Sequence, residues 1–127
     1  IATKNGDAAS QYGLKFMPTN SMHYTWISPT FTDNWQTYPG GTWNDAGYYK
    51  DSENRVHLRG AVSNGTVGNG AEIFILPAGF RPAKRELFVA ITNQKLGRVD
   101  ISTDGRVIPH TADNAWLSLD NLSFKAA

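Results

Sequence analysis

Residues 47–59 read Gly47-Tyr48-Tyr49-Lys50, Asp51-Ser52-Glu53-Asn54 and Arg55-Val56-His57-Leu58-Arg59. The middle segment is polar and is made of residues that favour turns. In the last segment Val56 and Leu58 alternate with charged or polar residues, so the apolar side chains face one way and the polar ones the other. This pattern predicts a β-hairpin whose turn covers residues 51–54.

The rest of the chain repeats this pattern of short apolar segments between turn residues. Asp104-Gly105, between two such segments, is a strong signal for a short hairpin turn. No segment has the spacing of an amphipathic helix. Roughly seven or eight strands at intervals of about 8 to 12 residues predict an all-β domain, either an antiparallel β-sandwich, a jelly roll or a barrel. The segments that follow the hairpin are 71–76, 87–91, 98–102, 106–108, 115–119 and 122–124.

Residues 87–91, Leu87-Phe88-Val89-Ala90-Ile91, are apolar at every position. A strand that alternates its side chains between two faces would therefore be apolar on both. Such a strand either lies in the centre of a sandwich or packs one face against another subunit.

Composition limits the classes of partner. The 127 residues include 40% hydrophobic residues, enough for one core but not for two. Twelve Lys and Arg against eleven Asp and Glu give a net charge of +1, and this balance argues against binding of nucleic acid or an anionic membrane surface. The longest apolar runs are much shorter than the roughly 20 residues of a membrane-spanning helix, so no membrane insertion is expected.

The two ends of the chain differ in character. Residues 1–25 mix Asn, Gly, Ser, Thr and Gln with isolated apolar residues, and they are interpreted as a connector. Residues 26–127 are interpreted as one β domain. Because the sequence starts at Ile1 and not at Met, a longer polypeptide is expected to precede it.

Catalytic and metal-binding motifs are missing from the sequence. It has no Cys, and its His residues have no partner at a known metal-ligand spacing. Acidic residues in turns can serve as Ca²⁺ ligands, but they more often cap backbone groups. With three Glu and no hydrolase motif, we expect no metal, no cofactor and no enzymatic activity. A pair of Asp residues brought together by the fold stays open.

An aromatic segment carries the functional interest. Aromatic rings with nearby polar groups can stack on sugars and bind their hydroxyls, but the same rings can also build a core. Trp26 and Trp35 fit a core or interface position better than a ligand site. The candidate ligand-binding residues are Tyr38, Trp43, Asn44, Asp45, Tyr48 and Tyr49.

Five pieces of sequence, in order between residues 43 and 124, resemble the C-terminal domain of bacteriophage tail-fibre and receptor-binding proteins. The first two pieces belong to the hairpin, and the third is the segment around Pro77-Ala78-Gly79-Phe80-Arg81-Pro82. The pieces are residues 46–52, 55–60, 73–82, 99–105 and 116–124, the last with Trp116, Ser118-Leu119-Asp120 and Phe124.

This resemblance implies a β-sandwich head domain, commonly a homotrimer, at the tip of a phage tail appendage. Its partners would be copies of itself, upstream fibre or tail proteins, and a saccharide or envelope polymer on the host surface. Its location would be the virion. Receptor contacts do not transfer between phages, and the shared motifs imply scaffold or trimer-interface roles for His57, Arg59, Phe88 and Trp116.

Three other functions remain open from the sequence. The domain could be a virion decoration or fibre domain without a receptor. It could be a fragment of a polysaccharide depolymerase, if two carboxylates meet in one cleft. It could also be a free-standing lectin or carbohydrate-binding module.

Overall fold

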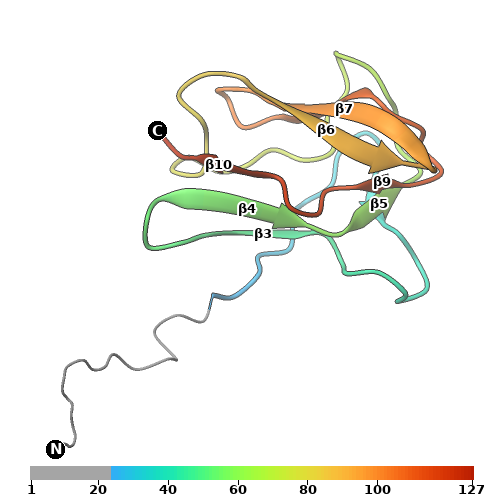
Figure 1. Ribbon diagram of the computed structural model, residues 1–127, viewed down its shortest axis with the longest axis horizontal. Coiled ribbons are helices and arrows are strands. Elements are labelled where there is room, and N and C mark those ends of the chain that lie inside the picture. Colours follow the sequence, from blue (N-terminus) through green and yellow to red (C-terminus); the bar gives the residue numbers. More distant parts are fainter. Residues whose placement is uncertain (1–23) are drawn as a thin grey trace, which may run out of the picture.

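The structure, a computed structural model, describes residues 24–127 (Figure 1). Almost all of the predicted connector over 1–25 lies outside the described residues. The described part contains strands and no helix, and every pair of strands is antiparallel, which confirms the predicted all-β class. The strands are β2 (Gln36–Thr37), β3 (Gly47–Lys50), β4 (Arg55–Arg59), β5 (Ala61–Ser63), β6 (Glu86–Thr92), β7 (Lys95–Ile101), β8 (Val107–Thr111), β9 (Leu117–Ser118) and β10 (Ser123–Lys125).

The strands form two sheets. One has the order β10-β4-β3 and the other the order β2-β5-β9-β6-β7-β8. In Figure 1, β3 and β4 lie below and β6 and β7 above, and the core fills the space between them. Fully buried side chains such as Val56, Phe74, Val99 and Leu117 come from both layers and from the loops that join them. This arrangement fits a β-sandwich. The described residues contain no helix that is long and apolar enough to span a membrane.

The predicted hairpin is confirmed, and residues 51–54 join its two strands as expected. Lys50 lies opposite Val56, and the amide of Asp51 donates to the carbonyl of Arg55. The Asp51 carboxylate accepts hydrogen bonds from the amides of Glu53 (2.9 Å) and Arg55 (3.0 Å). Asn54 has φ 66°, the left-handed geometry that often ends such a turn. This register places Tyr48 opposite Leu58, on the core side of the sheet.

Gly60 is where the chain leaves one sheet and enters the other. It has φ 100°, and a Cβ there would collide with the backbone of Asp45 and Ala46. Its amide donates a hydrogen bond of 2.8 Å to the carboxylate of Asp120. Glycine is therefore required both by its dihedral angle and by the close approach of a second segment.

Strand β6 has two apolar faces, as expected. It lies inside the six-stranded sheet, where Ala90 is buried and Phe88 packs at the margin of the core. On the other face Leu87, Val89 and Ile91 are 59%, 68% and 48% exposed, and Leu96 of β7 is 71% exposed. We call these four residues the outer apolar face.

The prediction of a regular strand over residues 71–76 is wrong. Phe74 and Ile75 make only isolated bridges, to Phe31 and Arg106. Ile73 and Phe74 are both buried although they are neighbours, so the segment does not alternate its side chains as a strand does. Its amides still bond to the carbonyls of Gly105 and Val107, and it lies as an irregular edge along β8.

Asp100 of β7 is fully buried and is held by two arginines. Its carboxylate contacts the guanidinium groups of Arg98 at 2.9 Å and Arg85 at 2.7 Å. Burial by itself would raise the pKa of Asp100, but the hydrogen bonds from Arg98 and Arg85 outweigh burial and lower that pKa. The ionised carboxylate thus stabilises the folded state.

Candidate functional site

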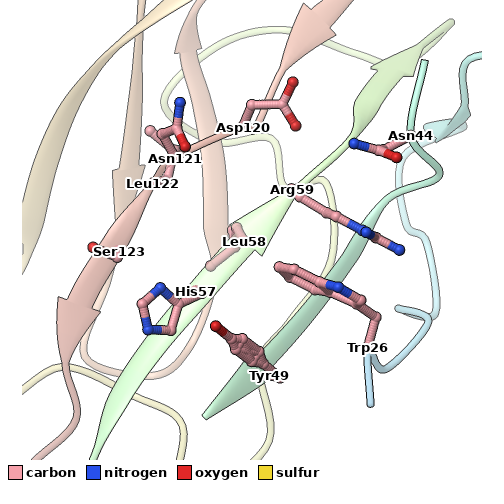
Figure 2. Close-up of a pocket in the computed structure, with 10 residues that line it drawn as sticks. All are labelled: Trp26, Asn44, Tyr49, His57, Leu58, Arg59, Asp120, Asn121, Leu122 and Ser123. Atoms are coloured by element: carbon pink, nitrogen blue, oxygen red, sulfur yellow. The ribbon is translucent and has the colours of Figure 1, made fainter. Parts of the chain in front are cut away.

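A groove of about 540 Å³ lies against the three-stranded sheet (Figure 2). Strand β4 provides its floor, β3 and the segment before β3 form one side, and the segment leading into β10 forms the other. The lining residues are Trp26, Asn44, Tyr49, His57, Leu58, Arg59, Asp120, Asn121, Leu122 and Ser123. Segments far apart in the sequence therefore build a single surface.

One side of the groove is aromatic. Tyr49 stacks on Tyr24, with ring centroids 4.9 Å apart, and on the imidazole of His57 at 4.7 Å. Trp26 meets Tyr49 edge-on at 4.6 Å. These contacts fix the rings relative to each other before any ligand arrives.

His57 is oriented by the hairpin turn. Its Nε2 lies 2.8 Å from a carboxylate oxygen of Asp51, a residue whose other oxygen binds two turn amides. The hydrogen bond from His57, followed by that from the amide of Arg55, lowers the pKa of Asp51. His57 is thus held by both a ring stack and a hydrogen bond to a carboxylate.

Arg59 lies on the face of Trp26. The centre of its guanidinium is 4.3 Å from the indole centroid, a cation–π contact. Its Nε is buried and has no hydrogen-bond partner within the described part of the chain. Figure 2 shows the guanidinium alongside the indole, with its end directed to the side where Asn44 lies.

The rim opposite the rings is polar. It consists of Asp120 and Asn121, which are exposed and precede β10, whereas Asn44 is exposed on the side of the rings, in the loop before β3. One carboxylate oxygen of Asp120 accepts a hydrogen bond from the amide of Gly60. This bond connects the rim to the point where the chain crosses between the two sheets. Asn121 has φ 67°, the turn geometry that Asn tolerates well.

A second hollow, of about 330 Å³, adjoins the groove at Asp120. Trp43 and Trp116 contact each other there at 5.2 Å, and Tyr38 contacts Trp43 at 4.8 Å. Trp43 is 42% exposed. Its lining consists of Trp43, Ala61, Ile91, Trp116, Ser118 and Asp120. We call it the tryptophan hollow.

The structure separates the predicted ligand-binding residues into several places. Tyr38 contacts Trp43 but lines a separate hollow beside Gln36 and Asn114. Trp43 lines the tryptophan hollow, while Asn44 and Tyr49 line the groove. Asp45 is exposed between them and lines neither. Tyr48 corrects the expectation, because it is only 7% exposed and packs on Phe74 and Phe80 in the core.

The residues expected to be scaffold or interface are also divided. His57 and Arg59 line the groove, Trp116 lines the tryptophan hollow, and Phe88 packs at the margin of the core. Sequence reasoning did not select Trp26, Asp120 or Asn121 for the site. Asp120 and Asn121 lie in a polar turn before the final strand, and such a turn gives only a weak signal in the sequence. They reach the groove because that strand pairs with β4.

Comparison with known proteins gives a structural match only. No protein-family model matches the chain, and no curated protein matches it. Among solved structures, the two-sheet fold described above is shared with a receptor-binding protein of a bacteriophage. That protein is the receptor binding protein gp15 of Listeria phage PSA, with a TM-score of 0.60 and 17% sequence identity. The match covers 84% of this chain and 67% of that one, and at this identity it shows a common fold.

Proposed function

We propose that this chain is the receptor-binding head domain of a phage tail appendage, which attaches the virion to a saccharide or related envelope polymer on the host. The observation that carries the proposal is the fold shared with a phage receptor-binding protein over 84% of the chain. The ordered sequence motifs between residues 43 and 124 support the same class.

The groove is the best candidate for the receptor site. Aromatic faces pack against the C–H faces of sugar rings, and Asn, Asp and Ser side chains can bind their hydroxyls. Tyr24 and His57 already stack on Tyr49, and Arg59 covers one face of Trp26, so these two rings present apolar edges to the groove. Trp43 of the adjoining hollow is 42% exposed and offers further ring surface. The polar groups for the hydroxyls are those of Asn44, Asp120 and Asn121. The tryptophan hollow extends this surface beyond Asp120.

The small number of carboxylates in the groove favours binding without hydrolysis. Of its lining residues only Asp120 carries a carboxylate, and that group already accepts a hydrogen bond from the Gly60 amide. Most glycosidases place a pair of carboxyl groups across the scissile bond. A binding site without chemistry therefore fits the groove better than a depolymerase cleft.

The outer apolar face supports assembly into a homotrimer. Leu87, Val89, Ile91 and Leu96 expose an apolar surface on neighbouring strands. Contiguous apolar patches are uncommon on monomers and mark interaction surfaces. We assign copies of this chain as the occupant, because trimeric heads are expected from the resemblance, and a mutual face needs no second partner.

A binding assay with cell envelopes tests the proposed function. The fluorescently labelled chain is mixed with envelopes from a panel of bacterial strains, and the bound fraction is measured after centrifugation. We expect binding to some strains only, lost after periodate oxidation of envelope sugars and retained after protease treatment. Absence of binding to every strain would contradict the proposal and favour a decoration domain.

A further inference from the structure

Arg59 is the charged group of the groove whose role the fold does not explain. Within the described part of the chain, no carboxylate forms an ion pair with it, although Arg85, Arg98 and Arg106 all have one. Its Nε is buried without a hydrogen-bond partner. The residue as a whole is only half-buried and lines the groove, so the rest of its guanidinium is the part that a ligand can reach.

The neighbouring charges do not neutralise Arg59. His57 is occupied by Asp51, and Arg55 donates to the carbonyl and hydroxyl of Ser123 at 3.3 Å and 3.2 Å. Asp120, on the opposite rim, accepts a hydrogen bond from the Gly60 amide and makes no ion pair with Arg59. The groove therefore has a guanidinium at one end, on Arg59, and at the other end the carboxylate of Asp120 beside the amide of Asn121.

The stack on Trp26 prepares the guanidinium for an oxyanion. A planar guanidinium can donate two parallel hydrogen bonds to a carboxylate or phosphate, while its face stays on an aromatic ring. The indole face at 4.3 Å restrains Arg59 in one orientation. Less side-chain entropy is then lost on binding, which favours affinity.

We propose that the groove selects an anionic saccharide unit, with its carboxylate or phosphate group held by Arg59 and its hydroxyls held by the Asp120 rim. This inference rests on the proposed function and names the chemistry of its ligand. An oxyanion on the sugar supplies acceptors for the guanidinium, and the sugar ring lies against the edges of Trp26 and Tyr49 that line the groove.

Matched pairs of sugars test the selection. Galactose is compared with galacturonate, and glucose with glucose 6-phosphate, by titrating each into the ¹⁵N-labelled chain and following amide shifts by NMR. At least one acidic sugar should bind about tenfold more tightly than its neutral counterpart, with shifts around Arg59 and Asn44. A carboxylate preference and a phosphate preference are distinguished by which pair shows the difference.

Variants assign the selection to Arg59. Arg59→Gln should remove the difference between acidic and neutral sugars, and Arg59→Lys should retain part of it, because Lys keeps the charge but not the fork. Lys84→Gln removes an equal charge from an exposed turn and should leave the selection unchanged. The preference should also weaken at high ionic strength.

The outcomes separate this inference from the proposed function. Equal affinity for acidic and neutral sugars, or no response to any of the four while envelopes are still bound, would overturn the anionic selection alone. If Arg59→Gln still prefers acidic sugars, the selection belongs to another residue, and the role of Arg59 is overturned. If no envelope is bound, the receptor-binding function itself fails.

Discussion

Tyr48 and Tyr49 are adjacent in the sequence but lie on opposite faces of β3. Tyr48 is opposite Leu58 and enters the core, whereas Tyr49 is opposite His57 and lines the groove. The alternation of a strand requires this difference. Which of the two enters the core depends on the length of the turn, because a shift of one residue exchanges the faces. The polar residues 51–54 predicted the turn but not its register.

The two tyrosines should therefore respond differently to truncation. Tyr48→Ala removes a buried ring and should lower the free energy of unfolding by about 3–5 kcal/mol. Tyr49→Ala should cost clearly less stability and should weaken envelope binding. Urea denaturation of both variants measures the first effect. Equal loss of stability in the two variants would contradict the placement of Tyr49.

The buried Asp100 makes stability depend on pH. Its pKa is lower in the folded than in the unfolded chain, so its contribution is present above the unfolded value of about 3.9 and is lost as pH falls through the folded value. Asp100→Asn should reduce stability at neutral pH by about 2–3 kcal/mol and flatten the loss of stability on acidification. Urea denaturation from pH 7 to pH 3 checks this.

The exposed Asp45→Asn serves as the control for charge removal. It should leave both the stability at neutral pH and the acid dependence close to those of the unmodified chain. An Asp100→Asn chain with the same acid profile as this control would show that the two arginines do not stabilise the ionised carboxylate.

At the scale of elements, two hairpins were predictable, whereas the β6–β7 hairpin, which turns at Asn93-Gln94, and the irregular edge were not. Strands β3 and β4, and β7 and β8 around Asp104-Gly105, follow local patterns of alternation and turn residues. Residues 71–76 have the composition of a strand, but their backbone bonds to β8 without regular pairing. Such a departure is determined by tertiary contacts that no local pattern contains.

The crossing between the sheets should be sensitive at Gly60. Gly60→Ala meets both an unfavourable φ and a collision with the backbone of Asp45 and Ala46, so it should destabilise the chain by several times the roughly 1 kcal/mol of strain alone. Gly68→Ala is the matched control, because Gly68 also has a positive φ but open space around it. Thermal denaturation compares the two. A similar melting temperature for both variants would contradict the close approach at Gly60.

At the scale of the whole molecule, the proposed homotrimer depends on the outer apolar face. Sedimentation velocity at micromolar concentration should give a trimer for the unmodified chain. Val89→Asp places a charge on the most exposed residue of β6 and should produce a folded monomer, because an unpaired charge in an apolar interface is costly. Thr103→Asp, in an exposed turn, should leave the trimer intact. A monomeric unmodified chain would exclude the homotrimer.

The candidate site itself was only partly predictable. The aromatic segment indicated Asn44 and Tyr49, which do line the groove. Asp120 and Asn121 reach it because β10 pairs with β4, more than sixty residues earlier in the chain. Trp26 reaches it through the bridge between Ile27 and Tyr48. Pairings over such sequence distances have no local signal, so the groove becomes visible only in the folded chain.

The most direct measurement of the central claim is the binding isotherm of the chain on envelopes of a strain that it recognises, compared with that of Asn121→Ala and Tyr49→Ala. Residues at the centre of an interface often lose about tenfold in affinity or more on truncation. We predict losses of this size for both variants, with the circular dichroism spectrum of a folded chain. Unchanged isotherms for both would contradict the assignment of the groove as the receptor site.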